Sequence, residues 1–173
     1  GHPEGTLQSS QSGEATDIRT LTGMLQSGEA TKRKLAAETL RTLGPLAREA
    51  VPSLLRALCE DELLPVRWRV ADALRRIGLT PENTSAVVKA MIHDPSRSVR
   101  WRAAEALREA AHWSQEVVYA LIRACADEDD WVCWHAEKAL NEISARRILI
   151  AELNSAALGD PSPAVRRNAA QAL

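Results

Sequence analysis

One sequence motif recurs along this chain at a nearly constant spacing. Its five copies share a leucine position, and successive leucines stand 34, 33, 33 and 33 residues apart. These leucines are Leu40, Leu74, Leu107, Leu140 and Leu173. Self-similarity at this period is typical of a solenoid, in which each repeat packs against its neighbours. Because no linker interrupts the copies, the repeat predicts a single elongated domain over residues 14–173.

Each copy carries the apolar pattern of an amphipathic helix. In the copy over residues 66–78, apolar residues stand at offsets 0, 4, 7, 8 and 11, which form one stripe. A second apolar segment precedes every copy, over residues 18–25, 50–59, 85–92, 116–125 and 147–158. Gly44 and Gly78 predict where two of the later helices end. The chain is therefore predicted to be all-α, an α-solenoid (superhelix) of about five helical hairpins, each a helix A followed by a helix B.

Composition narrows the possible partners and compartments. A net charge of −1 argues against a surface built throughout for nucleic-acid phosphates. The three cysteines have no CxxC spacing, which disfavours a disulfide framework and a zinc site and fits a reducing, cytoplasmic location. No apolar run approaches the roughly 18 residues that a membrane span needs. These features predict a protein or peptide partner rather than nucleic acid or membrane, and no cofactor or metal.

The two ends of the chain depart from the repeat. Residues 1–13 are rich in Gly, Ser and Gln and lack apolar periodicity, so a disordered tail is expected, and Gly1-His2 resembles a tag remnant. The last helix B stops at Leu173, whereas other copies continue for another turn, so Ala169 and Ala170 have no following repeat to cover them. Either a shortened chain or self-association through the C-terminal end is expected.

An aspartate and an arginine recur around each predicted turn. A spacing of six residues separates Asp61 from Arg67, Asp94 from Arg100, and Asp160 from Arg166. Recurrence in register favours a structural role for these residues over a catalytic use. In the fourth copy Cys133 replaces the arginine, which is expected to leave the acidic run 127–130 without that partner. A solvated loop is expected there, and a divalent-cation site is the alternative.

The repeat resembles a known family at the level of its motif. The pattern Asp-Pro-x-x-x-Val-Arg-x-x-Ala-Ala-x-Ala-Leu stands at 94–107 and 160–173, and Leu-Gly-Pro is followed by Ala-Val-Pro within 43–52. This pattern is similar to the short HEAT-like repeat of bilin lyase subunits and many scaffold proteins. The resemblance implies HEAT-like hairpins, an Asp–Arg pair between turn and helix B, and a bilin lyase-like subunit as one alternative function. Repeats of this kind serve many unrelated tasks.

Tryptophan marks the same position in three successive copies. Trp68, Trp101 and Trp134 lie almost opposite the Val/Leu stripe on a helical wheel, so they are expected to point outward on the concave face of the helices B. Polar or cationic side chains accompany them at matched offsets: Arg69, Arg102 and His135 one residue later, and Arg75 and Arg108 seven residues later. Stacking and bidentate hydrogen bonds at these residues predict a ligand-binding surface for an extended, acidic or phosphorylated partner.

Alternatives to this binding surface stay open. The arginine stems can cover the rings, and a repeated side chain can be inherited by duplication without being used. Trp68, Asp72 and Arg102 are similar in kind to the concave face of the HEAT-like alkylpurine DNA glycosylases, so a DNA-binding or glycosylase-type protein is a further alternative. Trp113 and Trp131 lie outside the register, in predicted turns, where local packing is expected.

No reactive constellation accompanies the repeats. Cys133 and His135 stand two residues apart on a predicted helix, so their side chains point about 200° apart and do not form a nucleophile–base pair. The sequence therefore predicts a non-catalytic protein-binding or scaffold module.

Overall fold

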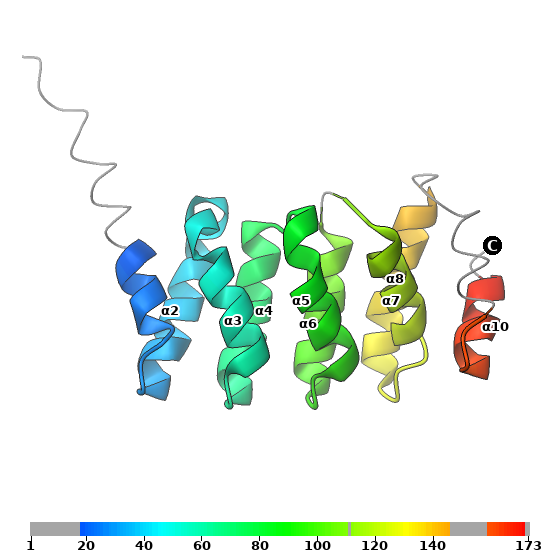
Figure 1. Ribbon diagram of the computed structural model, residues 1–173, viewed down its shortest axis with the longest axis horizontal. Coiled ribbons are helices and arrows are strands. Elements are labelled where there is room, and N and C mark those ends of the chain that lie inside the picture. The colour runs from blue at the N-terminus through cyan, green and yellow to red at the C-terminus, as the bar shows by residue number, and fades with distance from the viewer. Residues whose placement is uncertain (1–17, 111, 146–158, 172–173) are drawn as a thin grey trace, which may run out of the picture.

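Helical hairpins stacked side by side make up the fold (Figure 1). The computed structural model describes residues 18–110, 112–145 and 159–171, and within these ranges it contains helices and turns but no strand. The predicted tail over 1–13, the last predicted helix A over 147–158 and Leu173 lie outside the described residues. The described part confirms the predicted all-α solenoid.

In the first four hairpins a helix A pairs with a helix B, and of the last hairpin the structure describes helix B. The helices A are residues 18–24, α3 (Val51–Glu60), α5 (Thr84–His93) and α7 (Gln115–Ala124). The helices B are α2 (Ala30–Leu43), α4 (Leu64–Ile77), α6 (Arg97–Arg108), α8 (Asp130–Ala145) and α10 (Pro163–Gln171). Two 3-10 segments, η1 (Gly44–Ala50) and η2 (Pro81–Asn83), connect successive hairpins. As predicted, α2 and α4 end at glycines, and both glycines have positive φ, 56° at Gly44 and 93° at Gly78.

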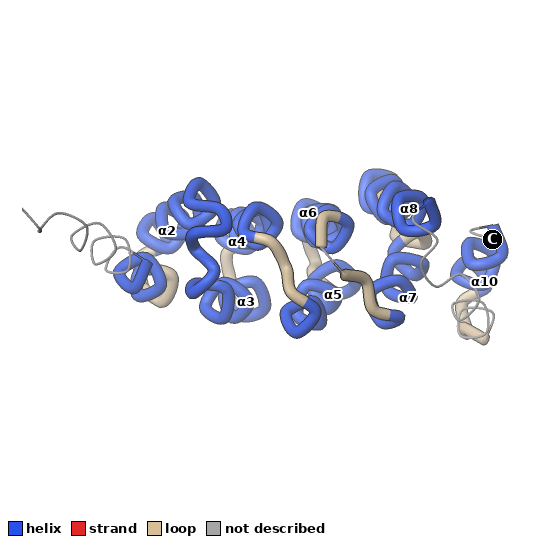
Figure 2. The backbone as a smooth tube through the Cα atoms, turned by 90° about the horizontal axis from the view of Figure 1, so that it is seen from above, coloured by secondary structure: helices blue, strands red, loops and turns tan. Residues whose placement is uncertain are grey.

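The helices form two rows (Figure 2). Helices α2, α4, α6 and α8 lie in one row, and α3, α5 and α7 lie in the other. Within the first row, α2 packs on α4, α4 on α6 and α6 on α8, more extensively than successive helices A pack together. Helix α10 breaks this pattern, because among the described residues it packs chiefly against α7 rather than α8. The helices B therefore present a continuous surface, here called the helix-B face, from α2 to α8.

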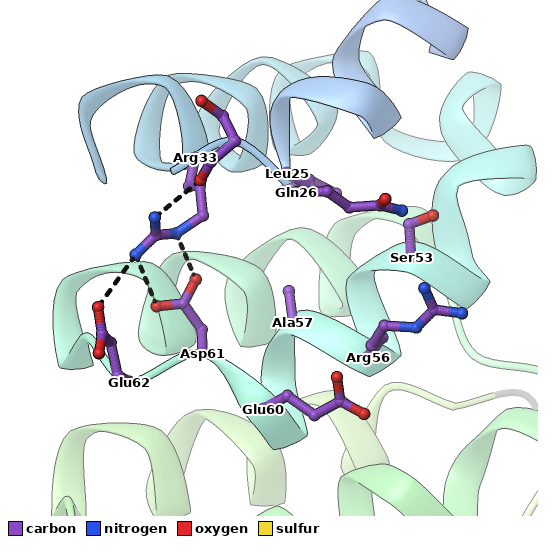
Figure 3. A pocket seen from close by; sticks show the side chains of 10 residues that line it. Leu25, Gln26, Arg33, Ser53, Arg56, Ala57, Glu60, Asp61 and Glu62 are labelled. Atoms are coloured by element: carbon purple, nitrogen blue, oxygen red, sulfur yellow. Dashed lines mark hydrogen bonds and ion pairs between the residues drawn. The ribbon is translucent and has the colours of Figure 1, made fainter. Parts of the chain in front are cut away.

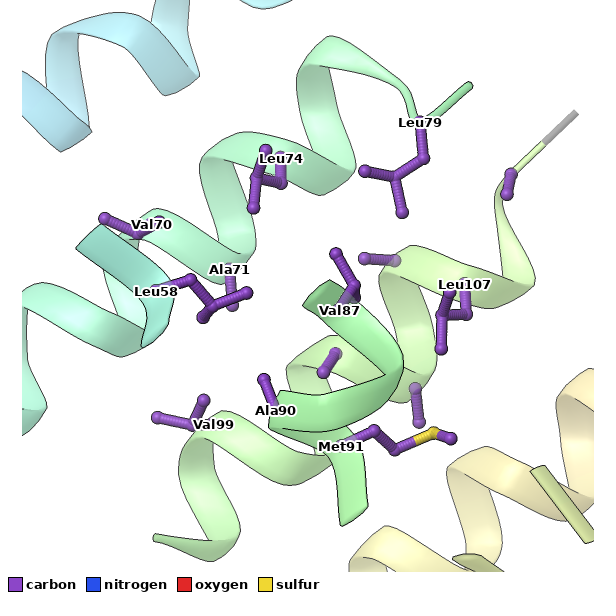
Figure 4. Packing of buried hydrophobic residues seen from close by; sticks show 14 of the residues in the cluster. Leu58, Val70, Ala71, Leu74, Leu79, Val87, Ala90, Met91, Val99 and Leu107 are labelled. Atoms are coloured by element: carbon purple, nitrogen blue, oxygen red, sulfur yellow. The ribbon is translucent and has the colours of Figure 1, made fainter. Parts of the chain in front are cut away.

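The recurring leucine lies in the core of the four hairpins in which it is described. Leu40, Leu74 and Leu107 are fully buried, and Leu140 is buried as well. Figure 4 shows Leu74 and Leu107 in one continuous apolar cluster with Met91 of the intervening helix A. Burial of one such side chain contributes about 1.5–3 kcal/mol, so the periodic leucines stabilise these hairpins to a similar degree.

A buried alanine recurs three residues before the repeated leucine on the first three helices B. Ala37, Ala71 and Ala104 occupy equivalent positions on α2, α4 and α6 and are fully buried. Their small side chains allow neighbouring helices B to approach closely. Glu137 takes this position on α8 and is exposed. The alanine register is therefore interrupted at α8, the last helix B that packs on its predecessor in the first row.

Arginine–aspartate pairs link each repeat to the next one. Three such pairs, with Nε–Oδ2 distances of 2.7–2.8 Å, are Arg33–Asp61, Arg67–Asp94 and Arg100–Asp127. The predicted pairing within a repeat is therefore wrong. Within its own repeat, Arg67 donates to a backbone carbonyl, Asp61 O, at 3.0 Å. Asp94 in turn accepts the Ser96 N–H at 2.8 Å, so one carboxylate orders its own turn and anchors the preceding repeat.

The junction between the fourth and fifth repeats has a tyrosine in place of the arginine contact. Cys133 occupies the arginine position on α8, and its thiol donates to the carbonyl oxygen of Cys125 at 2.7 Å. Asp160, the aspartate that an arginine at 133 would bind, instead accepts a hydrogen bond from the hydroxyl of Tyr119. This hydrogen bond lowers the pKa of Asp160. The residue that lost its arginine partner is therefore Asp160.

Three of the four acids in the run 127–130 have an arginine partner from the preceding repeat, so the predicted lack of an arginine is wrong for them. Asp127 binds Arg100. Asp129 lies 3.1 Å from Arg97 and accepts the backbone N–H groups of Trp131 and Val132, so it caps the start of α8.

Candidate functional site

The tryptophans of the helix-B face form one continuous stack with the groups between them. We call this stack the aromatic ladder. It consists of Trp68 and Arg69 on α4, Trp101 and Arg102 on α6, and Trp131, Trp134 and His135 on α8. The structure thus brings together six of the eight residues that the sequence predicted for this site. Arg75 and Arg108 lie beside the ladder, in a separate cluster of charges.

Arginines separate the rings in the first half of the aromatic ladder. The Arg69 guanidinium carbon lies 4.1 Å from the centre of the Trp68 ring. Arg102 lies between two rings, 4.7 Å from Trp68 and 4.0 Å from Trp101. Each distance is in the range of a cation–π interaction, which stabilises by about 0.5–2 kcal/mol. A residue of one repeat therefore covers the tryptophan of the preceding repeat.

His135 takes the arginine position in the second half of the aromatic ladder. Its ring stacks on Trp101, with centroids 4.9 Å apart and an interplanar angle of 20°. It meets Trp134 edge-on at 4.8 Å and Trp131 edge-on at 5.2 Å. The side chain is 5% exposed and neither ring nitrogen has a hydrogen-bond partner. Burial lowers the pKa of His135, so the ring is neutral at pH 7 and packs as an aromatic group.

Exposure rises along the aromatic ladder toward α8. Trp68 and Trp101 are half-buried, whereas Trp134 is 45% exposed and Trp131 is 52% exposed. Trp131 and Trp134 stack on each other, 5.1 Å apart at 12°. The expectation of local turn packing fits Trp113, which is buried and donates to the Leu107 carbonyl oxygen, but is wrong for Trp131. The signal in the sequence was the i, i+3 spacing of Trp131 and Trp134, which places both on one helical face.

A belt of ion pairs runs beside the aromatic ladder. This ionic belt contains three arginines and five acids: Arg41, Arg75, Arg108, Glu38, Asp72, Glu105, Glu109 and Glu142. Arg75 lies 3.0 Å from Asp72 and 3.2 Å from Glu109, and Arg108 lies 2.9 Å from Glu142. The donors of Arg75 and Arg108 are therefore largely engaged within the chain.

The two ladder arginines differ from the belt arginines. Arg69 donates to the carbonyl oxygen of Pro65 at 2.8 Å, and Arg102 donates to that of Ser98 at 2.9 Å. Among the residues that the structure describes, neither forms an ion pair with a carboxylate. Burial is the largest cause of the lowered pKa of Arg102, with Arg69 and Arg75 acting in the same direction and Asp72 and Glu105 in the opposite one. Both side chains are thus half-buried cations with unused N–H donors.

Two pockets lie away from the aromatic ladder. The larger, of about 380 Å³, lies between the first two hairpins, and Figure 3 shows that Arg33, one of its lining residues, points to Asp61 and Glu62. The smaller, of about 250 Å³, is lined by Cys59, Lys89 and His93 among others. No group of three or more potential metal ligands comes together within the described ranges. None of the described helices is long and apolar enough to cross a membrane.

Solved structures with the same arrangement of helices support the fold. An engineered protein is 22% identical, with 90% of this chain and 77% of that chain covered and a TM-score of 0.62. The complex of CpcE and CpcF of phycocyanin lyase from Nostoc sp. PCC7120 is 22% identical, covering 91% and 98%, with a TM-score of 0.59. A designed armadillo repeat protein is 20% identical, covering 94% and 83%, with a TM-score of 0.61. At these identities the likeness shows the fold, an all-α solenoid.

The family of this chain follows from a match to a family model rather than from a match to a curated protein. A search of curated proteins gives no significant match. The family model for HEAT repeats matches residues 18–108 and 84–173, which together cover the repeated part of the sequence. The resemblance seen in the repeat motif is thereby confirmed, and the chain belongs to the HEAT repeat family.

Proposed function

We propose that this chain is a non-catalytic protein-binding module whose helix-B face binds an extended partner segment carrying carboxylate or phosphate groups. The observation that carries the proposal is the state of Arg69 and Arg102. These two arginines are half-buried and form no ion pair within the described chain, on a face where Arg41, Arg75 and Arg108 are all paired with acids.

A partly desolvated guanidinium without a carboxylate favours an incoming anion. The cation has lost part of its hydration, and no nearby charge of the chain fully compensates for this loss. Stacking on Trp68 and Trp101 holds each guanidinium plane in place, so little side-chain entropy is lost when an anion binds. The remaining N–H donors match the two oxygens of a carboxylate or phosphate.

The ionic belt favours a peptide over nucleic acid. It holds five carboxylates and three arginines directly beside the aromatic ladder. With Arg69 and Arg102 included, the aromatic ladder and the ionic belt together carry five arginines and five carboxylates, so a polyanion laid along them meets no net positive charge. A peptide can instead direct single acidic side chains to Arg69 and Arg102. Asp72, the acid that a glycosylase-type site would use, is engaged by Arg75 and also lies 3.7 Å from Arg41.

Peptide selection tests the proposal. Peptides selected on the wild-type chain from a random display library are expected to be rich in Asp and Glu. Their affinity is expected to fall about tenfold in the Arg69→Gln/Arg102→Gln variant, which removes two charge-assisted contacts. The matched control is Arg48→Gln/Arg56→Gln, since both of these arginines are exposed outside the helix-B face.

Two outcomes would contradict the proposal. One is a set of selected peptides without acidic residues that bind both double variants equally. The other is a single-stranded DNA of about 20 nucleotides that binds the wild type more tightly than any selected peptide at physiological salt, where phosphate contacts are screened.

A further inference from the structure

We infer that the exposed Trp131–Trp134 pair, with Asp130 and Glu137 near it along α8, binds an arginine side chain of the partner segment. This inference rests on the proposed function, because it adds a second contact for the same segment on the same face. Together the two contacts give the bound segment a polarity, with its acidic side chains on Arg69 and Arg102 and its arginine at α8.

The alternation of tryptophan rings with nitrogen-bearing side chains of the following repeat stops at Trp134. Trp68 is covered by Arg102 of the following repeat, and Trp101 is covered by His135 of the following repeat. The equivalent residue after Trp134 is Asn168, which is uncharged and belongs to α10, the helix that packs mainly on α7. Among the described residues of the next repeat, no arginine or histidine contacts the Trp134 ring as Arg102 and His135 contact the rings before it.

Trp131 offers the open end of the stack. It stacks on Trp134 and is 52% exposed. Lys138 lies 5.0 Å from the centre of the Trp134 ring, and Trp131 is the more exposed of the two rings. The guanidinium is the group that this chain itself stacks on Trp68 and Trp101, and a partner arginine would extend the same arrangement.

Two unpaired carboxylates stand near Trp134 along α8, on the side of the helix that carries Cys133. Asp130 and Glu137 stand four residues before and three residues after Trp134 on α8, and both are exposed. Among the described residues neither has a cationic partner, and the contact of Glu137 is with the Cys133 thiol at 3.7 Å. The acids of the ionic belt, in contrast, all pair with arginines. A guanidinium is the group that can contact an aromatic ring and a carboxylate together, which neither an anion nor an apolar side chain does.

The spacing of the two contacts defines the segment. Packed helices lie about 10 Å apart, so α4 and α8 are about 20 Å apart across two junctions. About six extended residues span that distance. The partner segment is therefore expected to carry its arginine about six residues from the acidic residue that binds Arg69.

Three synthetic peptides test this polarity. The first has two glutamates and one arginine at the stated spacing, the second has glutamine in place of the arginine, and the third has glutamines in place of the glutamates. Fluorescence anisotropy measures their affinity for the wild-type chain, Trp131→Ala and Asp130→Asn/Glu137→Gln. Leu46→Ala and Glu49→Gln serve as controls, since both residues are exposed on η1.

The expected result is a loss that is specific to the α8 variants. The first peptide should bind the wild type and both controls about tenfold more tightly than the second, which corresponds to one stacked, charge-assisted contact. In Trp131→Ala and Asp130→Asn/Glu137→Gln the first and second peptides should bind within about twofold of each other, because the contact that distinguishes them is gone.

The comparison separates failure of the inference from failure of the proposed function. If the first and second peptides bind the wild type equally while the third binds more weakly, the inference is overturned and the proposed function stands. If the first and third bind equally while the second binds more weakly, the acidic contact is overturned and the arginine site stands. Absence of binding by the first peptide contradicts both.

Discussion

His135 is the most constrained side chain of the aromatic ladder. It is buried against Trp101, Trp131 and Trp134, and neither ring nitrogen has a hydrogen-bond partner. A buried imidazole without partners loses hydration when it is charged, so folding favours the neutral form. The same residue type at the surface would titrate near 6.5, its ordinary pKa. The position therefore links the stability of α8 to pH.

We predict that His135 makes the free energy of unfolding decrease as the pH falls through 6.5. The folded pKa lies below the unfolded value, so the unfolded chain takes up the proton first and is stabilised relative to the folded chain. The groups around the ring act in both directions: Glu105 raises its pKa, and Lys138, Arg108 and Arg102 lower it. One such group changes the free energy of unfolding by at most about 1.4 kcal/mol per pH unit.

Denaturant titrations between pH 5 and 7 measure this slope. His135→Phe keeps a planar ring in the stack and should remove the contribution. His93→Phe, a change at an exposed histidine on α5, is the control and should keep the wild-type dependence. An unchanged slope in His135→Phe would show that the histidine is not the group responsible.

At the scale of single contacts, Cys133 and Tyr119 form the exception to the repeat. An arginine introduced at 133 is expected to reach Asp160, because each arginine of this register binds the aspartate of the next repeat. We predict that Cys133→Arg raises the melting temperature by about 2–4 °C, the usual shift for a modest stabilising contact in a chain of this size. The increase in melting temperature from Cys133→Arg should be larger in a Tyr119→Phe background, in which Asp160 has lost its hydrogen bond from the tyrosine hydroxyl.

A lower stability of the Cys133→Arg variant is the alternative outcome. The Cys133 thiol is half-buried and bonded to the Cys125 carbonyl oxygen, so a long side chain could clash there. A lower denaturant midpoint at unchanged slope in both backgrounds would mean that the start of α8 has closed around the thiol.

At the scale of helices, the arginine–aspartate pairs determine how one hairpin is held against the next. Arg67 and Asp94 are 11% and 6% exposed, so the pair is largely removed from water. Removal of one member leaves the other buried without compensation, whereas removal of both charges does not. The pair therefore contributes more to the fixed geometry of the junction than to net stability.

We predict that Arg67→Met lowers the free energy of unfolding by about 2–4 kcal/mol, since it leaves Asp94 with only its backbone donor. The double variant Arg67→Met/Asp94→Asn should recover part of this loss, by about 1–2 kcal/mol. Urea denaturation of the single and double variants measures both values. Additive losses would show that the two residues act independently.

The Arg67–Asp94 pair shows what the sequence could predict about contacts between helices and what it could not. The residue types, their register and their structural role were all visible in the repeat. The partner was not, because in a periodic sequence a pairing six residues back and a pairing 27 residues ahead recur equally well. Only the direction of the side chain distinguishes them, and this depends on how neighbouring hairpins pack.

At the scale of the whole molecule, periodicity predicted the solenoid, the hairpins and the glycine stops of α2 and α4. It also predicted that the three repeated tryptophans share a face. Spacing did not predict which arginines pair with acids and which stack on rings, since the positions of Arg69 and Arg75 both recur at fixed offsets. Three-dimensional contacts place Arg75 and Arg108 among acids and leave Arg69 and Arg102 on the rings.

Side-chain NMR of the arginines tests most directly the claim that the helix-B face binds anions through its ladder arginines. The Nε–Hε resonances of all arginines are followed while the peptide with two glutamates and one arginine is added. The account predicts that the largest shifts belong to Arg69 and Arg102, with small changes at the ion-paired Arg75 and Arg108. Largest shifts at Arg75 and Arg108, or at Arg48 and Arg56 outside this face, would contradict it.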